Sequence, residues 1–250
     1  MFKSSNPALS ENTLKNITYV SSSEMMTISG TTNKTLLGIL LTFIAGAYSV
    51  YSIVNNPSTA GALTLTGSIG GFIAAMVTIF KPSIARYSMP IYAILEGVFL
   101  GAASIYIPAA FGAPISVVFQ AVAATAVTFA VMLLLYRTGV IKVTEKFRSI
   151  IIAATIGIAI VYFVLMIMSF FGNVSFMMGT SGLSIGVTAF AAVIAALNLA
   201  LDFDMVTRLS QSGAPKYMEW YGAFSILVTL VWLYLELLRL FAKLAASNRE

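Results

Sequence analysis

The stretch MEWYGAFSILVTLVWLYLELLRLF, residues 218–241, decides the fold class because it is long and apolar enough to cross a lipid bilayer. A helix needs about 20 residues to cross the hydrocarbon core. Glu219, Glu236 and Arg239 are the charged residues in this stretch. It therefore predicts a transmembrane helix, and the three-residue spacing of Glu236 and Arg239 predicts a local ion pair on one helical face.

The sequence contains six further apolar runs of similar length. Barrel strands would show about ten residues of alternating polarity, which these runs lack, so we expect helices throughout. The segments between the runs contain Pro, Gly, Asn and Ser, and the last of these breaks is FDMVTRLSQSGAPKY. The six runs are 35–54, 61–80, 88–107, 115–136, 149–171 and 183–201.

Composition supports a membrane location. Of 250 residues, 59% are hydrophobic and 9% are charged, with a mean hydropathy of +0.93, so ionic groups are too few to cover a water-soluble globule. The sequence has no Cys and no His. That excludes disulfides, zinc sites of the usual ligand set and histidine-based catalytic triads. We expect no enzyme activity and no cofactor.

The distribution of basic residues orients the predicted bundle. Eleven of the 14 Lys and Arg residues lie before the first run or after the second, fourth and sixth runs. The alternate loops 55–60, 108–114 and 172–182 contain no charged residue. The positive-inside rule then places the N-terminus in the cytoplasm, and we expect a bacterial cytoplasmic membrane. The net charge of +5 follows from this topology and indicates no nucleic-acid partner. Basic residues near the C-terminus would lie outside, so a re-entrant seventh segment is an alternative.

Three domains follow from these patterns. Residues 1–33 are rich in Ser, Thr and Asn and lack an apolar core of signal-peptide length, so we expect a mobile tail rather than a cleaved leader. Residues 34–245 form the seven-helix domain. Residues 246–250 form a short C-terminal tail.

Carboxylates within or near the membrane are the candidate functional residues. Glu96 lies about eight residues, or about 12 Å, into the third run, where an unpaired charge costs several kcal/mol. We expect it to face the bundle interior. Glu219 lies at the cytoplasmic start of the last run, on the same half of the membrane.

The stretch LNLALDFDMVTR, residues 197–208, places two more carboxylates at the end of the sixth run. Asp202 and Asp204 are two residues apart, which on a helix turns them about 200° from each other, so one ligand cannot contact both. Asp202 is in register with Asn198 and is the candidate for an inward position. Asp204 is expected to meet water and to pair with Arg208, four residues on.

These positions predict a convergence of Asp202, Glu96 and Glu219, with Lys81 or Arg86 nearby. Calcium prefers six to eight oxygen ligands, so three carboxylates would form a transient, partly hydrated site. Two carboxylates a few ångströms apart would titrate as a unit and make such a site sensitive to pH. The alternative is an ordinary belt of charges at the membrane interface.

Three segments carry a resemblance to a known family. YAILEGVFLGA (92–102), LALDFD (199–204) and GAPKYMEWYGAFSILVTLVWLYLELLRLF (213–241) resemble the Bax inhibitor family, also called the transmembrane Bax inhibitor motif family, in its bacterial branch. The likeness covers about residues 24–245. It implies a seven-helix fold in which six helices surround the last. It also implies a pH-sensitive calcium leak, in which aspartates of the last two helices share protons with help from a basic residue at the end of the second.

Carried over residue by residue, the first of these aspartates matches Asp202 and the basic residue matches Lys81, with Arg86 as the second choice. The second aspartate has no match, because Thr229 stands at its position. Glu96 and Glu219 are the substitutes that the chain offers.

The function predicted from these residues is a pH-sensitive calcium leak channel or cation transporter, with the lipid bilayer, calcium ions and protons as its partners. The main alternative is a non-transporting membrane protein that binds other membrane proteins and modulates stress or cell death. Proton-coupled exchange of another cation is a third possibility. An intramembrane aspartyl protease is disfavoured because the GxGD signature is absent, and a retinal pump because no run has a mid-helix lysine.

Overall fold

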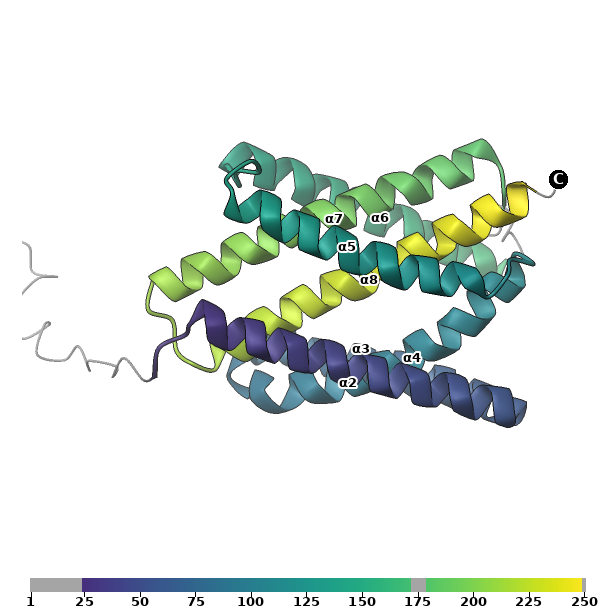
Figure 1. Ribbon diagram of the computed structural model, residues 1–250, viewed down its shortest axis with the longest axis horizontal. Coiled ribbons are helices and arrows are strands. Elements are labelled where there is room, and N and C mark those ends of the chain that lie inside the picture. The colour runs from purple at the N-terminus through teal and green to yellow at the C-terminus, as the bar shows by residue number, and fades with distance from the viewer. Residues whose placement is uncertain (1–23, 172–178, 249–250) are drawn as a thin grey trace, which may run out of the picture.

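The computed structural model describes residues 24–171 and 179–248, and this part of the chain folds into a bundle of long helices (Figure 1). Two short 3-10 helices, η3 (Pro57–Thr59) and η4 (Pro82–Ile84), precede the second and the third long helix. The long helices are α2 (Ile28–Asn55), α3 (Ala60–Phe80), α4 (Ala85–Ala110), α5 (Ser116–Arg137), α6 (Glu145–Phe170), α7 (Gly182–Gln211) and α8 (Met218–Ser247).

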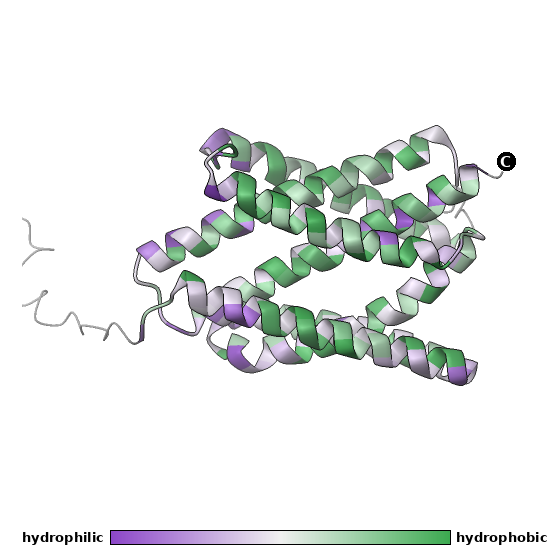
Figure 2. Ribbon diagram, viewed as in Figure 1, coloured by the Kyte–Doolittle hydropathy of each residue, from purple (hydrophilic) through white to green (hydrophobic). Residues whose placement is uncertain are grey.

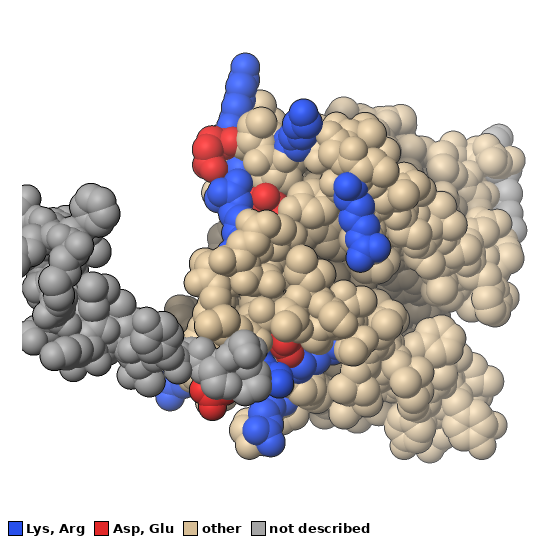
Figure 3. Space-filling view, turned by 60° about the vertical axis from the view of Figure 1, so that its left-hand side comes forward, with Lys and Arg blue, Asp and Glu red and all other residues tan. Residues whose placement is uncertain are grey.

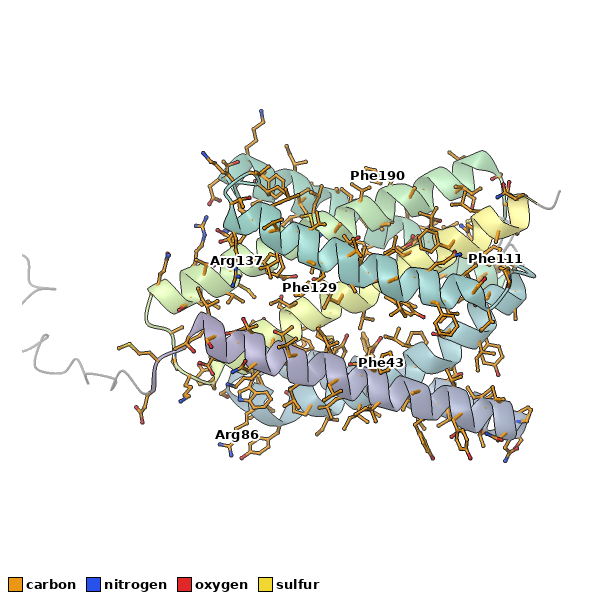
Figure 4. The ribbon with its side chains drawn as sticks, in the orientation of Figure 1. Phe43, Arg86, Phe111, Phe129, Arg137 and Phe190 are labelled. Carbon is orange, nitrogen blue, oxygen red and sulfur yellow. The ribbon has the colours of Figure 1, made fainter. Side chains whose placement is uncertain are left out.

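Seven helices in the described residues are long and apolar enough to cross a membrane, and they coincide with the seven predicted spans. Their outer surfaces are apolar over most of their length (Figure 2). Phe43 on α2 is 65% exposed and Phe190 on α7 is 54% exposed (Figure 4). Such large apolar side chains on the outside of a bundle are suited to lipid rather than water. The prediction of a multi-pass helical membrane protein is confirmed.

Helix α8 lies at the centre of the bundle, between a group formed by α2, α3 and α4 and a group formed by α5, α6 and α7 (Figure 1). Half of its 30 residues are buried. Leu233 and Leu238 are almost completely enclosed, and Leu233 packs in a cluster with Leu199 of α7. The predicted arrangement around the last helix is confirmed. Because α8 runs unbroken for 30 residues, the re-entrant alternative is wrong.

The break between the last two spans is shorter than predicted. Helix α7 continues to Gln211, so the expectation that the break begins at Phe203 is wrong, and both aspartates are helical. The helix ends just before Gly213, whose φ of 72° lies in the left-handed region that glycine adopts readily. Asp202 and Asp204 are therefore held in fixed positions on a helix rather than in a loop.

The first helix begins earlier than expected, at Ile28 rather than at residue 34. Thr27 caps it by accepting a hydrogen bond from Gly30 N at 2.9 Å. The segment before it pairs with the α7–α8 connection, because Met26 N donates to Ala214 O at 2.7 Å. Residues 1–23 lie outside the described residues, so the mobility of that part stays a prediction.

Close packing of α4 against α2 depends on two glycines in the quoted stretch YAILEGVFLGA. A Cβ at Gly97 would overlap the carbonyl oxygen of Thr42, and one at Gly101 would overlap that of Gly46. The backbones of the two helices therefore approach more closely than larger residues would allow. Small residues at helix crossings are the usual way in which membrane helices pack closely.

Charged side chains gather at one end of the bundle. Figure 3 shows Lys, Arg, Asp and Glu together at the end where α7 ends and α8 begins, while much of the rest of that face carries none. Arg86 and Arg137 both lie toward this end (Figure 4). The exposed basic residues that share it include Lys81, Arg86, Arg137, Lys142, Lys146 and Arg208.

Candidate functional site

Asp202 lies where α7 packs against α8, and two hydroxyl groups of α8 hold its carboxylate. Ser225 Oγ donates to Oδ1 and Thr229 Oγ1 donates to Oδ2, each at 2.6 Å. Ser225 and Thr229 are four residues apart, so both hydroxyls project from one face of α8. The predicted inward position of Asp202 is confirmed, and the carboxylate joins the last two helices directly.

The same two hydroxyl residues line a cavity of about 470 Å³ between α3, α4 and α8. Glu96 lines this cavity from α4, as the prediction of an interior position requires. Gly71 of α3 leaves room for its carboxylate, since a Cβ there would lie 2.7 Å from Glu96 Oε2. The other lining residues are mostly apolar or aromatic, with Ser68 as an additional hydroxyl: Phe72, Ala75, Ile79, Tyr92, Phe99, Tyr221, Phe224 and Val228.

Glu96 differs from the other membrane carboxylates in its partners. Within the described residues it forms no ion pair and no hydrogen bond, whereas Asp202, Asp204, Glu219 and Glu236 each have at least two partners. Its side chain is half-buried and borders the cavity. A carboxylate in this position is available to a cation that enters the cavity.

Glu219 does not join Asp202. It is 1% exposed and forms an ion pair with Lys34 of α2. It also accepts hydrogen bonds from the backbone N and the hydroxyl of Thr27, at 3.0 and 2.9 Å. Gly30 makes this possible, because a Cβ there would overlap the carboxylate. Glu219 thus fastens the start of α8 to the positively polarised N-terminus of α2, a favourable place for an anion.

The predicted convergence of three carboxylates is therefore wrong. In residues 24–171 and 179–248 the structure brings no three acidic, His or Cys side chains together as a metal site. Helix geometry gives the reason, because Glu219 precedes Thr229 by ten residues, or about 15 Å along α8. Asp202 and Glu96 remain the two carboxylates beside the cavity wall that Ser225 and Thr229 form.

Asp204 faces a different helix from Asp202, as their spacing predicted. Its Oδ2 accepts from Arg208 Nε at 2.7 Å, which confirms the predicted pair, and from Arg148 NH2 of α6 at 2.8 Å. Asp204 is only 9% exposed, so the expectation that it mainly meets water is wrong. A carboxylate between two guanidinium groups is a structural link between α6 and α7.

The two predicted basic partners lie apart from Asp202. Lys81 ends α3 and is exposed, and neither it nor Arg86 forms an ion pair in the described residues. The Arg86 guanidinium lies over the ring of Tyr87 at 5.2 Å. Asn198, expected to share a polar stripe with Asp202, instead donates to Thr155 Oγ1 of α6 at 2.8 Å. The immediate partners of Asp202 are therefore hydroxyls rather than a cation or an amide.

A second polar cluster lies toward the other end of α8. Glu236 is completely buried and lies 3.5 Å from Arg239 NH1, which confirms the predicted ion pair. Tyr162 OH of α6 and Trp232 Nε1 also donate to Glu236, at 2.8 and 3.0 Å. The charge in this cluster is more enclosed than a simple surface pair would be.

The sequence identified the membrane carboxylates but not most of the residues that bind them. From the sequence alone, Lys34 served only to orient the bundle in the membrane. It is the seventh residue of α2, and a lysine within an apolar helix needs a carboxylate partner. Ser225 and Thr229 had a readable signal, because their four-residue spacing places two hydroxyls on one face of α8. The pairing of Arg148 with Asp204 had no readable signal, since nothing in the sequence pairs the start of α6 with the end of α7.

Together, the fold and the site define a multi-pass helical membrane protein in which a polar contact at Asp202 joins the last two helices. The chain belongs to the Bax inhibitor 1 like family, whose family model matches residues 6–246. A comparison with individual curated proteins finds no match. The resemblance seen in the sequence is thus confirmed at the level of the family.

Proposed function

We propose that this protein is a pH-sensitive cation leak of the membrane, with calcium as the expected ion and Asp202 as the proton-sensing group. The main support for this proposal is that Asp202 accepts hydrogen bonds from Ser225 and Thr229, which also line the cavity containing Glu96. A change in the charge of Asp202 therefore acts directly on the α7–α8 contact and on one wall of the cavity.

The hydrogen bonds of Asp202 allow protonation to change the charge of its carboxyl group without breaking the contact between α7 and α8. An ionised Asp202 accepts from both hydroxyls. When Oδ2 is protonated it can donate to Thr229 Oγ1, and the Thr229 hydrogen can turn to Ser225 O, which lies 3.3 Å away. Protonation thus neutralises the site and reverses one hydrogen bond. We propose that ionised Asp202 favours cation entry and that neutral Asp202 disfavours it, because a fixed negative charge lowers the free energy of a cation nearby.

Glu96 provides the second negative charge. Besides this carboxylate, neutral hydroxyl residues line the cavity: Ser68, Tyr92, Tyr221, Ser225 and Thr229. Calcium affinity depends on the number of charged ligands, so a site with one carboxylate binds the ion weakly. A calcium ion there would keep part of its water shell. Such weak, hydrated coordination suits permeation, because an ion must also leave the site.

Orientation forms part of the proposal. The end of the bundle that carries Asp202 also carries most of the Lys and Arg residues. The positive-inside rule then places this end in the cytoplasm, so Asp202 would respond to cytoplasmic pH, in the cytoplasmic membrane of a bacterial cell.

The test is calcium flux into proteoliposomes between about pH 5 and pH 8, a range in which perturbed carboxyl groups titrate. Asp202→Asn keeps the size and hydrogen-bonding capacity of the side chain but removes its titration, so the flux should lose most of its pH dependence. Asp204→Asn is the matched control on the same helix and should retain that dependence. Equal effects of both variants would refute the role of Asp202.

The flux assay also separates the alternatives. A protein that only binds membrane partners should give no calcium flux at any pH. A proton-coupled exchanger should give flux that stops when the proton gradient is removed, whereas a leak should continue down the calcium gradient alone. Glu96→Gln should lower the flux at every pH if Glu96 is the cation ligand.

A further inference from the structure

Lys243 of α8 is a buried cation at the end of the bundle away from Asp202. It is 4% exposed. Its ammonium group donates to Ser184 Oγ at 2.7 Å and Thr188 Oγ1 at 2.9 Å, and lies 3.4 Å from Ser184 O. These acceptors are neutral and belong to α7. Buried ammonium groups ordinarily have a negative partner, because burial of an uncompensated charge costs several kcal/mol.

The surrounding charges do not balance Lys243. Within the described residues it forms no ion pair with a carboxylate, and the nearby Glu236 is paired with Arg239. Ser184 is the third residue of α7, so the positive end of that helix dipole also points into this region. In residues 24–171 and 179–248, two cations, one carboxylate and a helix N-terminus leave a net positive potential around Lys243.

A small cavity lies where this positive potential is concentrated. Its volume is about 20 Å³, enough for one particle about the size of a water molecule. Lys243 and Arg239 line it together with the hydroxyls of Tyr162, Ser184 and Thr188. The Arg239 guanidinium lies over the Tyr162 ring at 5.2 Å. Among the described residues it has one ion pair, with Glu236, so most of its five N–H donors are left for another acceptor.

We propose that this cavity between α6, α7 and α8 binds one small monovalent anion of the halide class, held by Lys243 and Arg239. A halide accepts hydrogen bonds from any direction and supplies the missing negative charge. A phosphate or carboxylate group is larger than this space, so a halide fits it better. A water molecule fits the space but leaves the positive charge uncompensated.

The anion would have a structural effect that is independent of the proposed cation leak. Tyr162 and Ser184 come from α6 and α7, while both cations come from α8. A bound anion therefore draws these three helices together at the end opposite Asp202. Because it binds the folded state, it should stabilise the protein by an amount that grows with the logarithm of the halide concentration above the Kd.

The experiment measures the Tm of the purified full-length protein in detergent against increasing sodium chloride or sodium bromide, with sodium gluconate keeping the ionic strength constant. We expect Tm to rise with either halide and, above the Kd, to increase with the logarithm of the halide concentration. Lys243→Met should abolish the rise. Lys142→Met, which removes an exposed lysine at the other end of the bundle, should leave it intact. No rise relative to gluconate, or a rise that is the same in Lys243→Met, would overturn the proposal.

A second measurement needs no variant. Crystals of the unmodified protein grown in sodium bromide should give an anomalous scattering peak within hydrogen-bond reach of Lys243 and Arg239. Absence of that peak at bromide concentrations well above the Kd fitted to the Tm rise would assign the cavity to water and overturn the proposal. Neither measurement involves calcium flux, so failure of the leak proposal would leave this result unaffected.

Discussion

Thr229 donates a 2.6 Å hydrogen bond to Oδ2 of Asp202 across the contact between α7 and α8. Thr229 occupies the position at which the family resemblance implies a second acid. A hydroxyl can donate to an ionised carboxylate and accept from a protonated one, so it can pair with Asp202 in both states. Two adjacent acids would instead compete for one proton. We therefore expect Asp202 to titrate as a single carboxyl group rather than as one half of an acid pair.

Removing the Thr229 hydroxyl should shift that response. Thr229→Val keeps the shape of the side chain but takes one donor from the ionised form of Asp202, so protonation becomes easier. The midpoint of the pH dependence of calcium flux should move to higher pH by about one to two units, since a hydrogen bond to a charged group contributes about 1.5 to 3 kcal/mol. Thr229→Ser retains the donor and should keep the midpoint close to that of the parent. An unchanged midpoint in Thr229→Val would contradict this role.

Placing an acid at position 229 should restore coupled titration. In Thr229→Asp the two carboxyl groups would lie within reach of one proton, so their titration should separate into two steps or broaden. The measurement is again calcium flux against pH. Adding Asp202→Asn to this variant should return a single, narrow transition. If Thr229→Asp alone keeps the narrow transition of the parent, the two positions do not share a proton.

Glu219 should matter for stability rather than for pH sensing. Glu219→Gln removes the negative charge that neutralises Lys34 at the start of α2 and α8. Breaking a buried ion pair by removing one partner costs about 3 kcal/mol. The free energy of unfolding in detergent should fall by about that amount. Glu145→Gln is the control, because Glu145 is 77% exposed and its loss should change stability by less than about 0.5 kcal/mol.

Most of the fold was readable from the sequence because lipid imposes a simple rule on it. Each run of about 20 apolar residues had to be a helix, since no other isolated segment satisfies its backbone in hydrocarbon. The boundaries were less readable, because apolar runs do not reveal how far a helix extends into the interface. The end of α7 shows this, as its last ten residues contain six charged or polar positions and still form helix.

The candidate site could be predicted from the sequence only in part, because the sequence does not show how the helices pack against one another. Helical periodicity predicted that Asp202 and Asp204 diverge, which is a property of one helix. The pairs Glu219–Lys34 and Asp204–Arg148 join helices far apart in the sequence, and their formation depends on how those helices pack. Depth along the membrane placed Glu96 and Glu219 on the same half, but it could not show which face each residue occupies.

The orientation in the membrane can be tested with tags. A tag inserted between residues 138 and 146 should be labelled only from the cytoplasmic side, because that loop and its flanks are basic. A tag in the uncharged loop 172–182 should be labelled only from the outside. The measurement is the reactivity of each tag in intact cells and in inverted vesicles. Labelling of both tags from the same side would contradict the seven-span topology.

The last prediction concerns the approach of α2 to α4. A Cβ at Gly101 would overlap the carbonyl oxygen of Gly46 and would lie 2.7 Å from the Ser49 Cβ. Both neighbours belong to a helix that cannot bend locally without loss of backbone hydrogen bonds. Gly101→Ala should therefore push the helices apart, and overpacking of this kind costs about 1 to 3 kcal/mol.

Gly157 of α6 provides the matched control, because a Cβ there would meet no atom within 4 Å. Alanine is a better helix former than glycine by up to about 1 kcal/mol, so Gly157→Ala should leave the stability unchanged or increase it. The measurement is the unfolding midpoint of both variants in the same detergent. A lower midpoint for Gly101→Ala beside an equal or higher one for Gly157→Ala would separate steric overlap from helix propensity. Equal midpoints would show that α2 and α4 have more freedom to separate than their close packing indicates.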